Sequence, residues 1–346
     1  MPPKISVVMS VYNAGGFLRE AVDSVLAQTF EDCEFVIIDD GSTDDSLPML
    51  KKVSDRRVRI IQQENRGLVA ALNRGIEQST GQLIARMDAD DRCEPDRFAM
   101  QVRYLDNHPE VALLGGSVAT MDEAGNRLAP CVAFPATHEE IWAGIGRRPW
   151  VFCHPAVMYR REAAIEVGLY RPDFAHCEDT EFFARLMTRH RAANLPQVLL
   201  NYRLCRSAVS FTKTAHGRIN AELVARIIDR WHEGEPFAPT PQERNFADAE
   251  IAEHQDVPSP GQLDSAYHIR VGRELLRGRK WQRAFRHYFT AGKSDHLNRM
   301  VYVGMVCALF HMGGGASETD CESDEDSQIH GDVAPVTGAK HRISLP

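Results

Sequence analysis

Short β-branched apolar runs alternate with helical patterns over the first half of the chain, and this alternation constrains the fold more than any other feature. Strands that alternate with helices are typical of βαβ units and a parallel sheet. The expected strands are Ile5 to Val11, Phe35 to Ile38, Val58 to Gln62 and Leu83 to Met87. Because runs such as "FVII" are continuous, helices should cover both faces of the sheet. The sequence therefore predicts an α/β fold with a doubly wound, mostly parallel sheet.

Polar clusters follow three of these strands directly. In a doubly wound sheet, ligands bind at the carboxyl ends of the strands, which lie along one edge. We therefore expect the three clusters to form one site. They are "SVYN" with Ser10, Tyr12 and Asn13, "DDGS" with Asp39 and Asp40, and "DADD" with Asp88, Asp90 and Asp91.

The "DADD" cluster places three carboxylates within four residues, where they repel one another. In an extended chain, residues two apart face the same way, so Asp88 and Asp90 should converge while Asp91 points elsewhere. This arrangement suits a hard divalent cation, Mn or Mg. A solvated turn that caps the helix opening at Pro95 would have a similar composition. The trio by itself is compatible with both interpretations.

The pattern becomes mixed after Asp91. We expect a helix from Pro95 to Leu105, a hairpin that turns near Gly125, and then a strand and two helices. The second of these helices follows "HCEDTEFF", where Glu178 and Asp179 would complement the helix dipole.

A mostly helical region begins near Ile219. It includes "HIRVGRELLRGRKWQRAFRHYFTAGK", which breaks at Gly278 and has an aromatic stripe that includes Trp281 and Phe289. A contact with a membrane surface or polyanion would explain its basic residues, and so would a helical hairpin with a solvated basic face. The segment Met300 to Phe310 is too short to span a bilayer and should be a docked helix. The acidic tail from Gly313 onward should be disordered.

Several classes of protein are disfavoured by composition and missing motifs. A net charge of −8 argues against a nucleic-acid partner. Eight cysteines without a C-x-x-C pair indicate free thiols in a reducing cytosol. The run "ISVVMSV" lacks the features of a signal peptide, and no stretch approaches a transmembrane span. The chain has no G-x-G-x-x-G motif of a dehydrogenase, and "SVYNAGGFLRE" offers little of the basic phosphate loop of a nucleotidyltransferase.

The runs "ISVVMSVYNAGGFLREAVDSVLAQTFEDCEFVIIDDGSTDDS", "NRGLVAALNRGI" and "GQLIARMDADD" together resemble the family 2 glycosyltransferases, inverting enzymes of the GT-A fold. The resemblance covers about residues 4–203. It implies that the first two polar clusters hold the nucleotide of a sugar donor. Tyr12 would lie against the base with Ser10 and Asn13 beside it, and Asp40 would accept a hydrogen bond from the base edge, with Asp39 as its neighbour.

The same resemblance implies a metal site and a catalytic base. Asp88 would contact the ribose or the metal, and Asp90 would ligate the metal that bridges the donor diphosphate. Such a cation stabilises the charge that accumulates on the leaving nucleoside diphosphate. Asp179, with Glu178 beside it, would be the base that takes the proton of the incoming hydroxyl. Arg203 lies where relatives carry a basic residue that could reach the diphosphate, although a surface ion pair would explain it equally well.

Two histidines are weaker candidates. His154 in "FCHPAVMYRR" resembles a position near the acceptor side of the family, and His176 lies beside the acidic pair. A lone histidine is more often structural.

These observations predict a metal-dependent inverting glycosyltransferase in cell-surface polysaccharide synthesis, which transfers a sugar from a nucleotide diphosphate donor to a hydroxyl of a glycan or lipid-linked acceptor. UDP is the donor nucleotide expected from the family. The alternative is a non-catalytic glycan-binding or assembly protein with the same fold. We expect a cytoplasmic protein that contacts the inner face of the membrane through its C-terminal helices. The expected divisions are a catalytic domain of residues 4–215 with halves 4–110 and 111–215, a helical region of 216–312 and a tail of 313–346.

Overall fold

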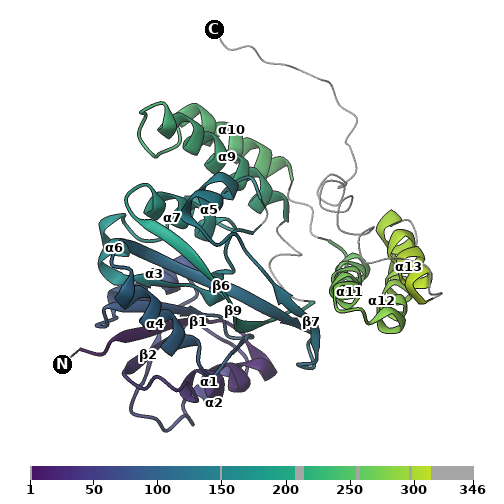
Figure 1. Cartoon of the computed structure of the whole chain (residues 1–346), viewed down its shortest axis with the longest axis horizontal. Helices are drawn as coiled ribbons and strands as arrows, with labels where there is room; N and C mark the ends of the chain where they lie inside the picture. The colour runs from purple at the N-terminus through teal and green to yellow at the C-terminus, as the bar shows by residue number, and fades with distance from the viewer. Residues whose placement is uncertain (1, 149, 207–213, 255–257, 296–297, 313–346) are drawn as a thin grey trace.

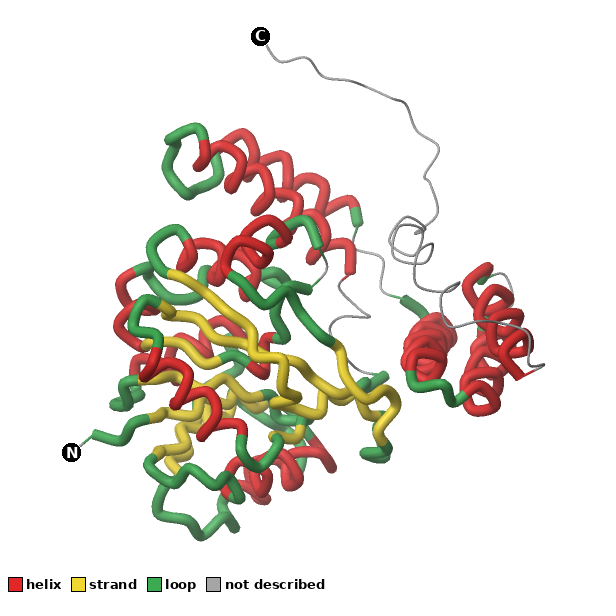
Figure 2. The backbone as a smooth tube through the Cα atoms, viewed as in Figure 1, coloured by secondary structure: helices red, strands yellow, loops and turns green. Residues whose placement is uncertain are grey.

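The computed structural model describes residues 2–148, 150–206, 214–254, 258–295 and 298–312. Its main body is one mixed sheet with helices on both faces, and three further helices lie beside β7 (Figures 1 and 2). The strands are β1 (Ile5–Val11), β2 (Cys33–Asp39), β3 (Val58–Gln62), β4 (Leu83–Met87), β5 (Arg92–Cys93), β6 (Val111–Met121), β7 (Arg127–Val132), β8 (Met158–Arg160) and β9 (Arg191–Arg203). The α-helices are α1 (Leu18–Leu26), α2 (Ser46–Leu50), α3 (Leu68–Glu77), α4 (Arg97–Asn107), α5 (His138–Gly144), α6 (Arg161–Glu166), α7 (Glu178–Met187), α9 (Thr214–His232), α10 (Pro241–Glu253), α11 (Pro260–Arg277), α12 (Trp281–Ser294) and α13 (Arg299–Met312). Short 3-10 helices span Gly15–Phe17, His154–Ala156 and Pro172–Phe174.

The strand order is β3-β2-β1-β4-β8-β6-β9-β5, and β7 pairs with β6. Strands β3, β2, β1 and β4 are parallel, so their carboxyl ends lie along one edge. Strand β8 then runs antiparallel between β4 and β6, and β6 pairs in parallel with β9. Because Val11 is opposite Asp39 and Met9 is opposite Met87, the polar residues that follow these strands meet at that edge.

Each face of the sheet carries its own hydrophobic core. On β1, Val7 and Met9 belong to a core shared with α1 and α4, whereas Val8 belongs to a core shared with α3, α6, α7 and α9. Successive residues of a strand point to opposite faces, so covering both faces requires an unbroken apolar run. The prediction of helices on both faces is confirmed.

The predicted elements of the first half agree closely with the structure. Strands β1, β3 and β4 have the predicted bounds, while β2 extends the predicted run to Cys33 and Asp39. The hairpin of β6 and β7 turns through Asp122 to Asn126, where Gly125 adopts a φ of +81° that favours glycine. The α/β class and the C-terminal helical region are confirmed. The sheet itself is mixed, with its parallel strands concentrated toward the N-terminus of the chain.

The C-terminal helices α11 to α13 share a third core, to which β7 contributes Leu128. The predicted break at Gly278 separates α11 from α12. Most of the predicted aromatic stripe serves this core, because Tyr288 is buried and Phe285 packs against it. Phe289 remains half exposed. The predicted disordered tail lies outside the described residues.

Two global features concern thiols and membranes. The seven cysteines within the described residues are thiols that are not joined in disulfides. In the same part of the chain, no helix has both the length and the apolar character needed to cross a bilayer.

Candidate active site

The loops that follow β1 and β2 are tied together by side-chain hydrogen bonds. The backbone N–H of Asn13 donates to Oγ of Ser42 at 3.1 Å, and the N–H of Thr43 donates to Oδ1 of Asn13 at 2.8 Å. Asn13 has a φ of 50°, a conformation that asparagine tolerates better than most residues. Tyr12, beside the joined loops, is 52% exposed. The structure therefore brings "SVYN" and "DDGS" together as predicted.

Asp39 ends β2 and Asp40 follows it, and the two carboxylates have different hydrogen-bonding environments. Asp40 accepts hydrogen bonds from Nε2 of Gln63 at 2.6 Å and from the N–H groups of Arg66 and Gly67 at 2.9 Å each. Its carboxylate thus organises the loop before α3. Asp39 is equally buried, yet its Oδ1 has no hydrogen-bond partner among the described residues. Because a buried acceptor without a partner is costly, Asp39 is the better candidate for an external donor group.

The aspartates after β4 form the cluster that the sequence predicted. One oxygen from each of Asp88, Asp90 and Asp91 lies within 4.8 Å of the others. We expected Asp91 to point elsewhere, but the chain leaves the strand at Met87, so simple alternation no longer holds. Among the described residues, Oδ2 of buried Asp91 has no hydrogen-bond partner. This donor set, three carboxylates with an open acceptor, fits a hard divalent cation.

The electrostatics of the cluster reflect burial and mutual repulsion. Burial, with the charge of Asp88, raises the pKa of Asp90 to about 6. Burial, together with Asp90 and Asp88, raises the pKa of Asp91 well above its ordinary value. Both effects disfavour three ionised carboxylates, and a bound cation would reverse that preference.

Arg86 is a site residue that sequence reasoning missed. It is only 3% exposed and forms an ion pair with Asp88. Burial works against its charge, but the interaction with Asp88 prevails and raises its pKa. Its charge also lowers the pKa values of Asp90 and Asp179, against larger opposing effects of burial. The signal was present in "LIARM", where an arginine interrupts a run that is otherwise apolar.

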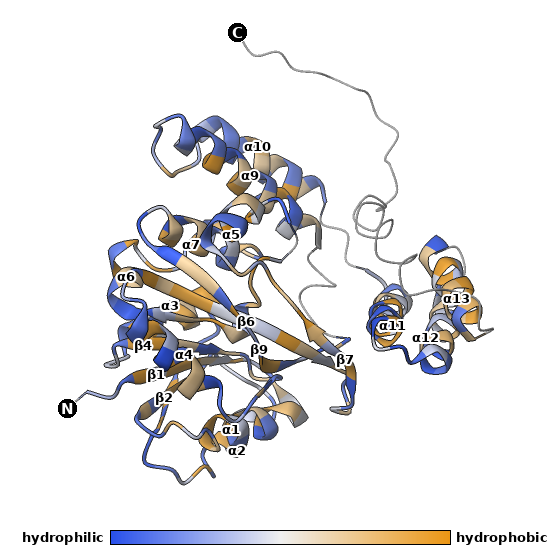
Figure 3. Cartoon of the chain, viewed as in Figure 1, coloured by the Kyte–Doolittle hydropathy of each residue, from blue (hydrophilic) through white to orange (hydrophobic). Residues whose placement is uncertain are grey.

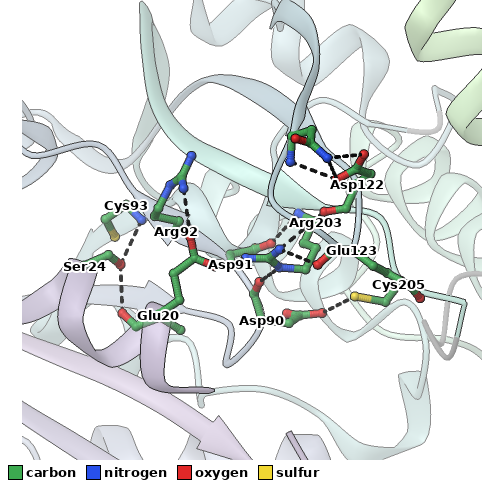
Figure 4. Close-up of polar contacts among 12 residues, drawn as sticks. Glu20, Ser24, Asp90, Asp91, Arg92, Cys93, Asp122, Glu123, Arg203 and Cys205 are labelled. Carbon is green, nitrogen blue, oxygen red and sulfur yellow. Dashed lines mark hydrogen bonds and ion pairs between the residues drawn. The ribbon is translucent and has the colours of Figure 1, made fainter. Parts of the chain in front are cut away.

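Arg203 is an anchor of the cluster, as Figure 4 shows. Its backbone N–H donates to Oδ1 of Asp91 at 2.7 Å, and its Nε donates to the carbonyl of Asp90 at 2.6 Å. The remaining guanidinium nitrogens contact Glu20 and the carbonyls of Asp122 and Glu123. This arrangement commits Arg203 to the protein and favours a positioning role over the expected contact with a diphosphate.

A cysteine also borders the cluster. Cys205 directs its Sγ to Oδ2 of Asp90 at 3.5 Å (Figure 4). Burial, followed by the charge of Asp90, raises the pKa of this thiol, so it is protonated at neutral pH. The thiol therefore acts as a weak donor to Asp90 in this structure.

The acidic pair opens α7 as predicted. Glu178 is buried, and burial with the charge of Asp179 raises its pKa to about 7. Burial likewise raises the pKa of Asp179, whose Oδ1 accepts the N–H of Thr180 at 2.6 Å. A carboxylate with a raised pKa is a stronger proton acceptor, so this environment suits a general base.

The two histidines have distinct surroundings. Nε2 of His154 lies 3.0 Å from the hydroxyl of Tyr170, and burial, then the charge of Arg86, holds its pKa well below the ordinary range. His154 is therefore neutral. His176 is exposed, has a φ of 66°, and its ring lies 5.7 Å from that of His216.

Solved structures identify the class of fold. The structure of S. aureus TarS residues 1–349 in complex with UDP-GlcNAc is similar to this chain with a TM-score of 0.53 and 17% identity, covering 90% of this chain and 92% of that one. The UDP complex of the same protein gives a TM-score of 0.52. The fold is that of the GT-A glycosyltransferases.

Sequence comparisons identify the family. Residues 6–168 match the family described as Glycosyl transferase family 2. The amylovoran biosynthesis glycosyltransferase AmsE of Erwinia amylovora is 34% identical over 207 residues, which cover 57% of this chain and 75% of AmsE. EpsE of Bacillus subtilis, also named as a glycosyltransferase, is 32% identical over 238 residues, which cover 66% of this chain and 83% of EpsE. The chain belongs to glycosyl transferase family 2 and is a glycosyltransferase.

Proposed function

We propose that this chain is a metal-dependent inverting glycosyltransferase that transfers a sugar from a nucleotide diphosphate donor to a hydroxyl group. The observation that carries the proposal is the convergence of the aspartates after β4 at the carboxyl edge where the ends of β1 and β2 also meet. The carboxylate cluster suits the cation of a nucleoside diphosphate, and the exposed aromatic ring suits its nucleobase.

Mn or Mg is the proposed cation, held by Asp90 and Asp88 with Asp91 close by. The bound cation would stabilise the negative charge of the departing nucleoside diphosphate. Arg203 would hold Asp90 and Asp91 in place through the hydrogen bonds described above. The alternative, a solvated turn, is less compatible with the burial of Asp91.

The nucleotide would lie over the loops after β1 and β2. Tyr12 offers the exposed ring for the base, with Ser10 and Asn13 beside it. We propose that Asp39, whose Oδ1 lacks a partner among the described residues, accepts the N–H of the base edge, while Asp40 positions the loop beneath it. UDP is the proposed nucleotide. The UDP and UDP-GlcNAc complexes of TarS, a protein of similar fold, support this choice.

Asp179 would be the base that accepts the proton of the incoming hydroxyl, and its charge would help to keep the neighbouring Glu178 protonated. The proposed acceptor is a glycan or lipid-linked sugar in cell-surface polysaccharide synthesis. The similarity to a protein named for amylovoran biosynthesis supports this choice. A lipid-linked acceptor implies a cytoplasmic protein with a peripheral membrane contact through the C-terminal helices.

The proposed domain division follows the same roles. Residues 4–215 would form the catalytic domain, with the donor held by 4–110 and the acceptor by 111–215, and residues 216–312 the helical region.

Turnover tests the proposal. The purified chain would be incubated with a panel of UDP-sugars, with and without Mn, and release of UDP would be measured with acceptor mixtures of polysaccharide precursors. We expect Mn-dependent release that Asp90→Asn abolishes. Asp106→Asn, which removes an exposed carboxylate on α4, is the matched control and should retain activity. Full activity of Asp90→Asn, or of the wild type in EDTA, would refute the metal role. A wild type that binds glycan without turnover would favour the non-catalytic alternative.

A further inference from the structure

Helix α13 presents an apolar face whose side chains are largely exposed. Val306 is 65% exposed and Phe310 is 56% exposed, and Tyr302, Val303 and Leu309 lie on the same side at helical spacing. Figure 3 shows this helix as a concentrated apolar segment next to the more polar α12. Large exposed apolar patches mark interaction sites.

The opposite face of α13 packs against α12, and this packing determines which side of α13 is exposed. Val301 and Ala308 are buried in the core shared with α12. Gly304 packs so closely on Tyr288 that an added Cβ would lie 2.2 Å from its ring. The exposed residues therefore cannot turn inward without breaking this contact.

The helical pair α12 and α13 carries an excess of basic residues. Neither α12 nor α13 contains an aspartate or glutamate, whereas Arg283, Arg286, Lys293 and Arg299 are all exposed. The ammonium of Lys293 lies 4.9 Å from the ring centroid of half-exposed Phe289. Apolar and cationic side chains are thus interleaved on this helical pair.

An open hollow of about 450 Å³ lies where the start of α12 meets the end of α13. Its lining includes Arg279, Lys280 and Arg283 from the first segment and His311 and Met312 from the second. Lys280 also donates to the carbonyl of Arg127, and Arg283 lies 3.5 Å from Oδ2 of Asp122. Met312 follows Leu309 by three residues, so the apolar strip continues into this cationic hollow. A hollow of this kind suits a phosphate group at the edge of an apolar surface.

We propose that the α12–α13 surface docks on an anionic lipid membrane, with the apolar face of α13 in the acyl boundary and the hollow against lipid phosphates. Apolar residues flanked by Lys and Arg are the signature of helices that lie in the membrane interface. A second copy of the chain is a poorer occupant, because pairing two such surfaces would juxtapose like charges. This inference deepens the proposed membrane contact, places it on α13 instead of the Trp281 stripe, and rests on no step of sugar transfer.

Vesicle binding by the full-length chain tests the proposal without turnover. The probes are vesicles of phosphatidylcholine alone and vesicles with about 30% phosphatidylglycerol, in low and high salt. We expect sedimentation with the anionic vesicles only, weakened by salt. Val306→Asp/Phe310→Ser and Arg286→Glu/Lys293→Glu should each weaken binding at least about tenfold. Ile165→Asp and Lys51→Glu/Lys52→Glu, exposed changes of the same kind elsewhere, should bind as the wild type does.

Three results would overturn the proposal. The first is failure of the wild type to bind anionic vesicles, and the second is undiminished binding by both surface variants. The third is concentration-dependent dimerisation, measured by analytical ultracentrifugation, that Val306→Asp/Phe310→Ser abolishes, which would assign the face to a second copy. Circular dichroism of each variant confirms folding. The surface variants should release UDP at the wild-type rate in detergent-free buffer. Failure of membrane docking is therefore distinguishable from failure of sugar transfer.

Discussion

The backbone N–H of Arg203 donates to Oδ1 of Asp91 at 2.7 Å and thereby joins the end of β9 to the aspartate cluster after β4. These residues are separated by more than a hundred positions in the chain. The contact places a buried carboxylate against a backbone donor whose position is fixed by the sheet. It makes the geometry of the cluster depend on β9, which pairs in parallel with β6.

Asp91→Ala should destabilise the protein, because it leaves the N–H of Arg203 buried without an acceptor. The expected loss is about 1 to 3 kcal/mol in the free energy of unfolding. Asp91→Asn keeps an acceptor oxygen and removes a repelling charge, so it should be at least as stable as the wild type in EDTA. Urea denaturation of both variants measures the difference. Equal stability of Asp91→Ala and Asp91→Asn would show that the contact contributes nothing.

Arg86→Met should destabilise the protein, because the charge of Arg86 offsets the repulsion among the carboxylates after β4. Because the Asp88 side chain is 32% exposed, the loss should lie below the roughly 3 to 5 kcal/mol that removing one partner of a fully buried ion pair costs. Because the pKa of Asp90 is raised to about 6, protonation of Asp90 below that pH should reduce the loss, and saturating Mn should reduce it at pH 8. Thermal unfolding at pH 5.5 and 8, with and without Mn, checks this. A loss independent of both pH and Mn would indicate a packing role alone.

Glu178→Gln should flatten the pH dependence of stability. The folded pKa of Glu178 is raised to about 7 from an ordinary 4.5, chiefly by burial. Between these values the folded state binds more protons than the unfolded state, so this group makes stability fall as pH rises from 4.5 to 7. At pH 8 Glu178→Gln should be more stable than the wild type by on the order of 1 to 3 kcal/mol. Urea denaturation of both proteins from pH 5 to 8 measures the free energy of unfolding. If this free energy depends on pH in the same way for both proteins, Glu178 does not titrate as proposed.

Asp179→Asn should lower kcat by about 10² to 10⁴, the usual contribution of a general base. Because burial raises the pKa of Asp179, activity of the wild type should rise with pH through a value above the ordinary carboxyl range. A pH–rate profile of UDP release measures both effects. The matched variant Asp173→Asn, on an exposed neighbour in the preceding 3-10 helix, should retain the wild-type profile.

The sequence predicted the parts of the fold in which local pattern and tertiary environment agree. Strands β1, β3 and β4 are short continuous apolar runs with polar residues at their carboxyl ends, and their bounds followed from that pattern. The pairing of β6 with β9 could not be predicted, because parallel register between distant segments leaves no local signal.

The candidate site was predictable as a set of residues but not as a set of contacts. Arg86 was overlooked because its position in an apolar strand gives no indication of which carboxylates it faces. The order of Asp39 and Asp40 was assigned from the family resemblance, whereas the hydrogen bonds from Arg66 and Gly67 that occupy Asp40 form only in the folded loop. Spacing in a sequence does not specify which acceptor is already satisfied.

The most direct test is calorimetry of nucleotide binding. UDP, GDP, dTDP and CDP would be titrated into the wild type with and without Mn, and into Asp90→Ala with Mn. A site of the proposed kind predicts selective binding of UDP that requires Mn and weakens at least about tenfold in Asp90→Ala. Binding that is equally strong without Mn or in Asp90→Ala, or no binding of any of the four nucleotides, would contradict a metal-dependent nucleotide site at this edge of the sheet.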